Sequence, residues 1–222
     1  MREIIFADRT HAGQLLAGAL EKYADRRDVI VLGLPRGGVP VAFEVAKRLH
    51  APLDVIVVRK LGVPGWEELA MGAIASGGVR VINDEVVNPS RIPTETIDRV
   101  AAAQMEELKR RETAFRGRPG APDVKDRIVI LVDDGIATGS TIRAAVLALR
   151  QQSPAKIVIA VPTAAADSCD SLEPMVEEFI TLVRPVYFHS VGQWYGNFQQ
   201  TTDDEVKELL AEAALHEPTG GG

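Results

Sequence analysis

The sequence has 222 residues, of which 46% are hydrophobic and 25% are charged, a balance typical of a globular protein that buries a core without disulfides or metals. Its formal net charge of -6 argues against nucleic acid as a partner, because there is no surplus of basic side chains to replace the counterions of a phosphate backbone. Cys169 is the only cysteine and no apolar stretch approaches the roughly 20 residues that span a bilayer, so we expect a soluble, cytoplasmic protein with a structural cysteine and no membrane partner.

Apolar runs and helical patterns alternate along the chain. The runs are rich in Val and Ile and lack polar alternation, as in strands that are covered on both faces of a parallel sheet. In chain order we expect a helix at 15–23, a strand at 29–32, a helix at 41–49, a strand at 55–58, an antiparallel hairpin at 71–82, a helix at 94–115, a strand at 128–132, a helix at 142–149, strands at 157–161 and 179–183, and a last helix from 202. This alternation predicts the α/β class, with a mostly parallel central sheet flanked by helices.

Two local signals refine this arrangement. Gly77-Gly78, between two apolar stretches, has the signature of a two-residue turn, so the segment around it is expected to leave the sheet as a flexible antiparallel hairpin. Thr202 and Glu205 have the spacing of a capping box at the start of the last helix. The chain shows no internal repeat and no linker, and we expect a single domain over 1–222, with a core at about 25–182, a small C-terminal hood at 183–200 and a flexible tail at 217–222.

The segment 130–141, ILVDDGIATGST, joins a buried strand, two adjacent acids and a turn that opens a helix. Parallel sheets bind ligands beyond the carboxyl ends of their strands, and the backbone N–H groups at a helix start favour a phosphate. Asp133 and Asp134 would repel that phosphate, so they require hydroxyl donors or a cation instead. A ribose 5-phosphate offers both groups: a phosphate for the turn and hydroxyl donors for the two acids. A P-loop would need Lys where Ser140 stands, whereas a plain turn with acids capping the helix remains an alternative.

This segment resembles the 5-phosphoribosyl-1-pyrophosphate (PRPP) binding motif of the type I phosphoribosyltransferases, in which an apolar strand and two acids precede a T-G-x-T turn. The resemblance implies that Asp133 and Asp134 hold the ribose hydroxyls and, through them or through water, a Mg²⁺ ion. It implies that the 5-phosphate is held by the turn residues Ala137, Thr138, Gly139, Ser140 and Thr141. It further implies transfer of phosphoribosyl from PRPP to a nitrogenous base, release of pyrophosphate, and a homodimer; the base is not identified.

The first expected strand ends in GLPRGGVP, at 33–40, which is similar to the pyrophosphate loop of the same family. Gly37 and Gly38 free the backbone to present N–H groups, and Arg36 adds a permanent planar cation. An exposed arginine in a tight turn is the alternative. Beside the Asp133-Asp134 motif, we expect this loop to bind pyrophosphate.

Arg59 and Lys60 follow the second expected strand, and should lie at the same edge of the sheet. With Gly62 and Pro64 after them, they resemble the start of the catalytic flexible loop in adenine and orotate phosphoribosyltransferases. Cations placed there would stabilise the negative charge that builds on the departing pyrophosphate. A surface pair of cations is the alternative. Glu67 and Glu68 come next and are candidates for acting on the acceptor, although solvent-facing positions are favoured.

The segment 188–198, FHSVGQWYGNF, concentrates aromatic rings in a chain that is only 5% aromatic. Trp194 and Tyr195, with Phe198, are candidates for stacking on a planar base under the hood, and an aromatic minicore below the last helix is the alternative. A non-catalytic regulatory protein that binds PRPP or a nucleotide, and a hydrolase that uses water as acceptor, remain rival functions. The four histidines show no metal-binding spacing with Cys169.

Overall fold

The computed structural model describes residues 6–117 and 120–215, so the expected tail at 217–222 lies outside the described residues. Its main sheet has five strands, all parallel, in the order β2-β1-β6-β7-β8. The strands are β1 (Val29–Gly33), β2 (Leu53–Val55), β6 (Ile128–Val132), β7 (Lys156–Thr163) and β8 (Glu178–Val183). Every residue of β1 and β6 is buried, as their unbroken Val and Ile runs predict for the centre of a doubly covered sheet. The predicted α/β fold is confirmed.

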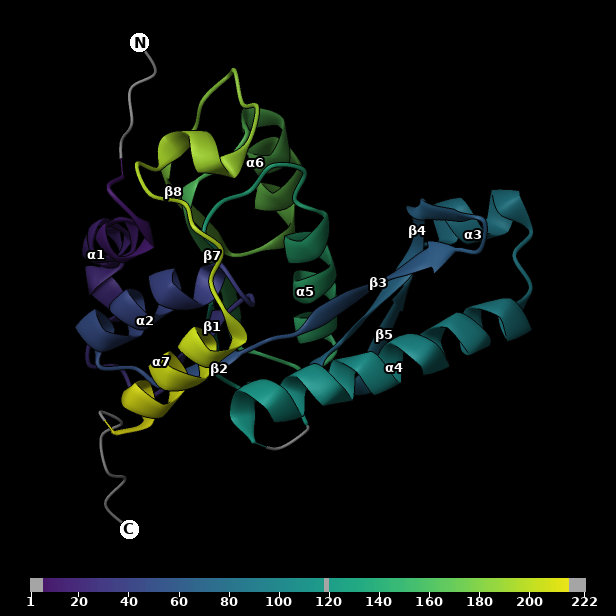
Figure 1. Ribbon diagram of the computed structural model, residues 1–222, viewed down its shortest axis with the longest axis horizontal. Helices are drawn as coiled ribbons and strands as arrows, with labels where there is room; N and C mark the ends of the chain where they lie inside the picture. Colours follow the sequence, from purple (N-terminus) through teal and green to yellow (C-terminus); the bar gives the residue numbers. More distant parts are fainter. Residues whose placement is uncertain (1–5, 118–119, 216–222) are drawn as a thin grey trace.

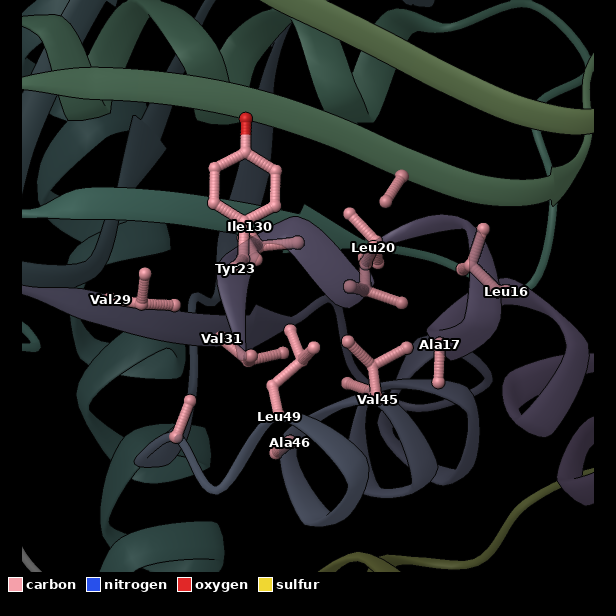
Figure 2. Packing of buried hydrophobic residues seen from close by; sticks show 14 of the residues in the cluster. Leu16, Ala17, Leu20, Tyr23, Val29, Val31, Val45, Ala46, Leu49 and Ile130 are labelled. Atoms are coloured by element: carbon pink, nitrogen blue, oxygen red, sulfur yellow. The ribbon is translucent and has the colours of Figure 1, made fainter. Parts of the chain in front are cut away.

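Helices cover both faces of this sheet (Figure 1). On one face pack α1 (Arg9–Ala19), the short η1 (Glu21–Tyr23), α2 (Gly38–Leu49) and α7 (Asp203–Leu215). On the other pack α5 (Ser140–Arg150), α6 (Ala166–Leu172) and η3 (Glu173–Met175). Figure 2 shows the first of these cores, where Leu16 and Leu20 face Val45 and Leu49 beside the strand residue Val31.

The inward face of α1 is set by its contact with α2. Leu16 and Leu20 are buried, whereas Leu15 is 45% exposed. The reason is the close approach of α1 to α2 at Gly13, where an added Cβ would lie 2.8 Å from the carbonyl oxygen of Val41. This contact turns Gly13 and Leu16 toward α2 and leaves Leu15 in solvent.

A separate antiparallel sheet, in the order β3-β4-β5, projects to one side of the main body as an arm (Figure 1). It contains β3 (Val58–Val63), β4 (Trp66–Ala75), the turn η2 (Ser76–Gly78) and β5 (Val79–Ile82), followed by α3 (Asp84–Ser90) and the long α4 (Thr94–Arg116). The predicted helix at 94–115 is confirmed, and its Ile97, Ala101 and Leu108 are buried against the arm.

Two expectations for this region are wrong in detail. The strand expected at 55–58 is divided, because β2 ends at Val55 and Val58 begins β3 in the other sheet. The Val57 N–H leaves the parallel ladder and donates to the buried Ser76 Oγ at 2.9 Å. That bond also keeps Ser76 in the turn, so the hairpin has a three-residue connection, Ser76–Gly78, in place of two residues.

The start of α7 and the segment before it complete the fold. The capping box is confirmed, since the Glu205 N–H donates to Thr202 Oγ1 at 3.1 Å and the Thr202 N–H donates to Glu205 Oε2 at 3.4 Å. Before it, the short η4 (Val191–Trp194) lies beside the N-terminal segment, where the Phe6 N–H donates to the carbonyl of Trp194 at 3.0 Å. Within 6–117 and 120–215, no helix combines the length and the apolar character that crossing a membrane requires.

Candidate functional site

Two loops leave the carboxyl ends of the neighbouring strands β1 and β6, whose last residues Gly33 and Val132 are paired in register. The loops remain in contact. A Cβ added to Gly37 would lie 2.8 Å from Asp134 Cγ, and one added to Gly38 would lie 2.8 Å from Asp133 Cα. The structure therefore brings Gly37 and Gly38 together with the two adjacent acids, and the absence of side chains on the glycines is what allows it.

The two acids are half-buried and close to each other. The Asp134 N–H donates to Asp133 Oδ1 at 2.9 Å. Burial, and next the negative charge of Asp134, raise the pKa of Asp133 well above its usual range. Burial also raises the pKa of Asp134, while the nearby Arg9 acts in the opposite direction. Two negative charges at this place are therefore costly, and a ligand that brings hydroxyl donors or a cation would relieve the cost.

The turn after the acids ends at Gly139, whose φ of 72° lies in the left-handed region, and α5 starts at Ser140. Gly139 has no side chain to cap the helix, so the first N–H groups of α5 need another acceptor. This contrasts with α1, where Asp8 Oδ1 accepts from the His11 N–H at 2.8 Å. The side chains of the turn, those of Ala137, Thr138, Ser140 and Thr141, are exposed.

Hydrogen bonds from neighbouring segments of the protein hold this turn in place. The Ile136 N–H donates to the carbonyl of Thr163 at 2.9 Å, and Ser168 Oγ donates to the carbonyl of Ala137 at 2.6 Å. At the open side, Thr138 Oγ1 lies 3.1 Å from Ser140 Oγ. The result is a well-supported turn at a helix start, adjacent to two carboxyl groups, and free N–H groups at a helix start are of the kind that favour an anion.

The cationic residues of the predicted site do not all lie beside the two acids. Arg36 belongs to the loop that contacts the acids, and its Nη1 lies 3.5 Å from Asp203 Oδ1 at the start of α7. Arg59 and Lys60, in contrast, do not follow a strand of the parallel sheet, and that expectation is wrong: both lie within β3. Arg59 Nε donates to Gln104 Oε1 of α4 at 3.0 Å. Both cations line an open pocket of about 500 Å³ between the arm and α4.

Glu67 lies on β4 and is exposed. Hydrogen bonds from its own backbone N–H and from that of Gly65, which donates at 3.1 Å, lower the pKa of its carboxyl group. These contacts are local to the hairpin, and they agree with a solvent-facing carboxylate. The side chain of Glu68 lies outside the described residues.

The aromatic segment covers the loop of the acids. A Cβ added to Gly135 would lie 2.6 Å from Val191 Cγ1, which shows how closely η4 packs on that loop. Tyr195 is only 4% exposed; its ring lies 5.3 Å from that of Phe6 and 5.0 Å from that of Phe198. Its hydroxyl donates to the backbone carbonyl of Asp134 at 2.5 Å. Trp194 is half-buried and stacks on Phe188 at 6.4 Å.

Sequence reasoning missed Arg9, the first residue of α1. Its Nε and Nη2 both lie 2.8 Å from Asp134 Oδ2, and its Nη1 donates to the carbonyl of Gln199 at 2.6 Å. Its guanidinium group also lies 4.0 Å above the ring of Phe198. Arg9 and Asp134 are 125 positions apart, and nothing in the local sequence indicates the pairing.

The site offers hard oxygen ligands of the kind that Mg²⁺ prefers, from Asp133 and Asp134. Among the residues that the structure describes, no cluster of three or more His, Cys, Asp or Glu side chains could hold a metal ion by itself. A magnesium ion here would therefore need oxygen atoms from a substrate or from water in addition to these acids. The indirect role expected for Asp133 and Asp134 stays a prediction.

Comparisons with known proteins show the family of this chain. A family model described as a phosphoribosyl transferase domain matches residues 9–174. Two proteins from two strains of Mycobacterium tuberculosis, each provisionally named phosphoribosyl transferase, are 50% identical over 210 residues, which is 94% of this chain and 47% of theirs. The chain thus spans about half the length of these curated relatives.

Solved structures show the same fold. The TT1426 protein from Thermus thermophilus is 41% identical, with a TM-score of 0.83 over 94% of this chain and 98% of that one. The AQ2163 protein from Aquifex aeolicus, at 12% identity and a TM-score of 0.50, covers 79% of this chain and 74% of its own, and shares the fold alone.

Proposed function

Because the chain belongs to the phosphoribosyltransferase family, we propose that it transfers the phosphoribosyl group of PRPP to a nitrogenous base and releases pyrophosphate. One observation carries this proposal: two carboxyl groups, Asp133 and Asp134, lie between an uncapped helix start and a loop rich in glycine. A sugar with a phosphate at C5 and a pyrophosphate at C1 has three groups that match, in order, the helix start, the two acids and the glycine loop. The 5-phosphate, the hydroxyls and the pyrophosphate each have a partner of suitable chemistry.

The 5-phosphate would bind the turn at 137–141. Its partners would be the first N–H groups of α5 and the hydroxyls of Thr138, Ser140 and Thr141. Asp133 and Asp134 would accept hydrogen bonds from the two ribose hydroxyls. The loop N–H groups at Gly37 and Gly38, with the guanidinium group of Arg36, would bind the pyrophosphate.

In the reaction, the bond between C1 of the ribose and the pyrophosphate oxygen breaks, and its electron pair leaves with the pyrophosphate. A nitrogen of the base forms the new bond to C1, and the proton on that nitrogen is released. Positive charge develops on the ribose in between, and the acids Asp133 and Asp134 would offset it. When bound, Mg²⁺ would supply positive charge to the leaving pyrophosphate.

Arg59 and Lys60 would add cationic charge to the leaving group if the β3–β4 hairpin approached the loop at 33–40. The short connection between β2 and β3 supports this proposal, because it attaches the arm at the same edge of the sheet. For the base, we propose Trp194 as the stacking residue. The buried Tyr195 is better suited to supporting Asp134 through its hydroxyl. From the family resemblance, we further propose a homodimer that acts in the cytoplasm.

The proposal is tested by pyrophosphate release from PRPP and Mg²⁺, with a panel of purine, pyrimidine and nicotinate-type bases. We expect release that depends on one class of base. The double variant Asp133→Asn/Asp134→Asn should lower the rate by on the order of 100-fold or more. The control Asp98→Asn, which changes an exposed acid paired with Arg80 on the arm, should keep the rate of the unaltered protein.

Other outcomes would identify the rival functions. Binding of PRPP without pyrophosphate release for any base would favour a regulatory protein. Equal release with and without a base would favour a hydrolase. Full activity in the double variant would refute the roles of Asp133 and Asp134.

A further inference from the structure

Arg9 connects three segments that are far apart in the sequence. It begins α1, it contacts the side chain of Asp134 after β6, and it donates to the carbonyl of Gln199 in the segment before α7. Only 12% of its side chain is exposed, and the Asp134 side chain is 14% exposed. An arginine this enclosed, with its fork directed at one carboxylate, restricts where that carboxylate can turn.

The contact is one-sided. Both Arg9 nitrogens that reach Asp134, Nε and Nη2, lie 2.8 Å from the same oxygen, Oδ2. A carboxylate gripped at one oxygen still has the lone pairs of its other oxygen for a ligand. Gly37 packs against this same carboxylate on the side of the glycine loop, so the group is held between Arg9 and the loop.

The backbone of Asp134 is held by the same neighbourhood. Tyr195 donates to the Asp134 carbonyl, and the Tyr195 ring packs on Phe198, over which the Arg9 guanidinium group lies. The main chain and the side chain of Asp134 thus both depend on the segment 195–199, one through Tyr195 and the other through Arg9. These two contacts distinguish Asp134 from a residue in an unrestrained loop.

We propose that Arg9 is a positioning residue for the sugar: by holding Asp134 Oδ2, it presents Asp134 Oδ1 to a hydroxyl of the ribose. This inference rests on the proposed function, because it concerns the same sugar site. Arg9 itself does not contact the reacting atoms. Its removal should weaken the recognition of one ribose hydroxyl. A residue that contributes only to folding would not show this selective effect.

The difference can be measured without knowing the base. Calorimetry would compare binding of ribose 5-phosphate, 2-deoxyribose 5-phosphate and 3-deoxyribose 5-phosphate to the unaltered protein and to Arg9→Met. We expect the unaltered protein to bind ribose 5-phosphate about tenfold more tightly than at least one of the deoxy sugars, because a hydrogen bond to a charged group is lost with the hydroxyl. In Arg9→Met that preference should fall to about twofold or less, while binding of the same deoxy sugar stays nearly unchanged.

Two further variants separate positioning from folding. Arg9→Lys keeps the charge without the planar fork and should restore only part of the preference. In an Asp134→Asn background, Arg9→Met should cause no additional loss of preference, since the oriented oxygen is already altered. The control Arg48→Met removes an exposed pair with Glu21 and should leave the preference intact. Thermal unfolding of each variant would show whether it is folded.

The outcomes are distinct. If the unaltered protein binds none of the sugar phosphates, and does not bind PRPP either, the proposed function fails. If it binds them with a clear preference for ribose, and Arg9→Met weakens all three sugars by one common factor, Arg9 is only structural and the inference is overturned. An unchanged preference in folded Arg9→Met would overturn it equally.

Discussion

Gly37 packs directly on the carboxyl group of Asp134: a Cβ at this glycine would lie 2.8 Å from Asp134 Cγ. The backbone of Gly37 has an ordinary conformation, with φ of -61° and ψ of -30°, which any residue can adopt. The requirement for glycine is therefore steric, and it comes from the acid in the loop after the neighbouring strand β6. The two loops of the proposed site depend on each other at this contact.

A methyl group at position 37 should consequently displace Asp134. We expect Gly37→Ala to weaken binding of ribose 5-phosphate between about tenfold and 100-fold, because small displacements of binding groups are costly in a preorganised site. Gly18→Ala is the matched control, since a Cβ at Gly18 meets nothing within 4 Å and the residue lies within α1. It should bind normally and unfold with a free energy about 0.5–1 kcal/mol higher. Calorimetry and denaturant unfolding test both; normal binding by Gly37→Ala would contradict the steric argument.

Arg36 is paired with Asp203 at 3.5 Å, and the two side chains are 36% and 53% exposed. Pyrophosphate would have to compete with this carboxylate for the guanidinium group. Because exposed ion pairs contribute only about 0.2–1 kcal/mol, Asp203→Asn should strengthen pyrophosphate binding by at most about fivefold. The gain should shrink as salt rises, since salt screens exposed charges.

The next residue supplies the control. Asp204 pairs with Lys207 at 2.8 Å, so Asp204→Asn should leave pyrophosphate affinity close to that of the unaltered protein. Equal gains for the two variants would mean that only the general loss of negative charge matters. With Arg36→Ala in the background, Asp203→Asn should give no gain.

The proposed role of the arm cations can be tested separately from sugar binding. We expect Arg59→Ala and Lys60→Ala each to lower the rate of pyrophosphate release by about tenfold to 100-fold, because each would remove charge that acts mainly in the transition state. Binding of ribose 5-phosphate should change little. Arg80→Ala on β5 is the control, as Arg80 lies in the same arm and pairs with the exposed Asp98. Unchanged rates in both variants would exclude these cations from the reaction.

The sequence was sufficient where the signal is local. The acids at 133 and 134 and the glycines at 37 and 38 each follow an unbroken apolar run, and parallel strands end at one edge, so their meeting could be predicted. Arg59 and Lys60 also follow an apolar run, but that run crosses from one sheet to another. Because the run is continuous, the sequence does not show where the chain changes sheets, which is at Val57, whose N–H donates to Ser76.

Arg9 could not be found in this way. Its partner Asp134 lies 125 positions away, and a single arginine at the start of a helix is not a motif. The burial of Tyr195 has the same origin, since its ring is enclosed by Phe6 from the opposite end of the chain. Contacts between the two ends of the chain depend on the folded arrangement, and local periodicity carries no information about them.

Far from the site, the first residues of β7 and β8 form a charged cluster that should make stability depend on pH. Lys156 Nζ lies 3.0 Å from Glu178 Oε2, and Tyr23 donates to the same oxygen at 2.6 Å. Burial alone would raise the pKa of Glu178, but hydrogen bonds from Lys22, Tyr23 and Lys156 outweigh it and lower that pKa to about 2. The folded state therefore binds the proton of Glu178 less readily than the unfolded chain does.

A lowered carboxyl pKa stabilises the folded state above the ordinary value of 4.5, and this stabilisation is lost as the pH falls toward about 2. At pH 7 we expect Glu178→Gln to lower the free energy of unfolding by about 1–2 kcal/mol, a figure reduced for partial exposure of the group. Urea unfolding at several pH values should show the gap between the two proteins closing below about pH 4. Glu106→Gln, at an exposed pair with Lys109, should change stability by less than about 0.5 kcal/mol throughout. A gap that stays constant from neutral to acidic pH would show that Glu178 contributes through packing, because a contribution from its charge must disappear when the carboxylate is protonated.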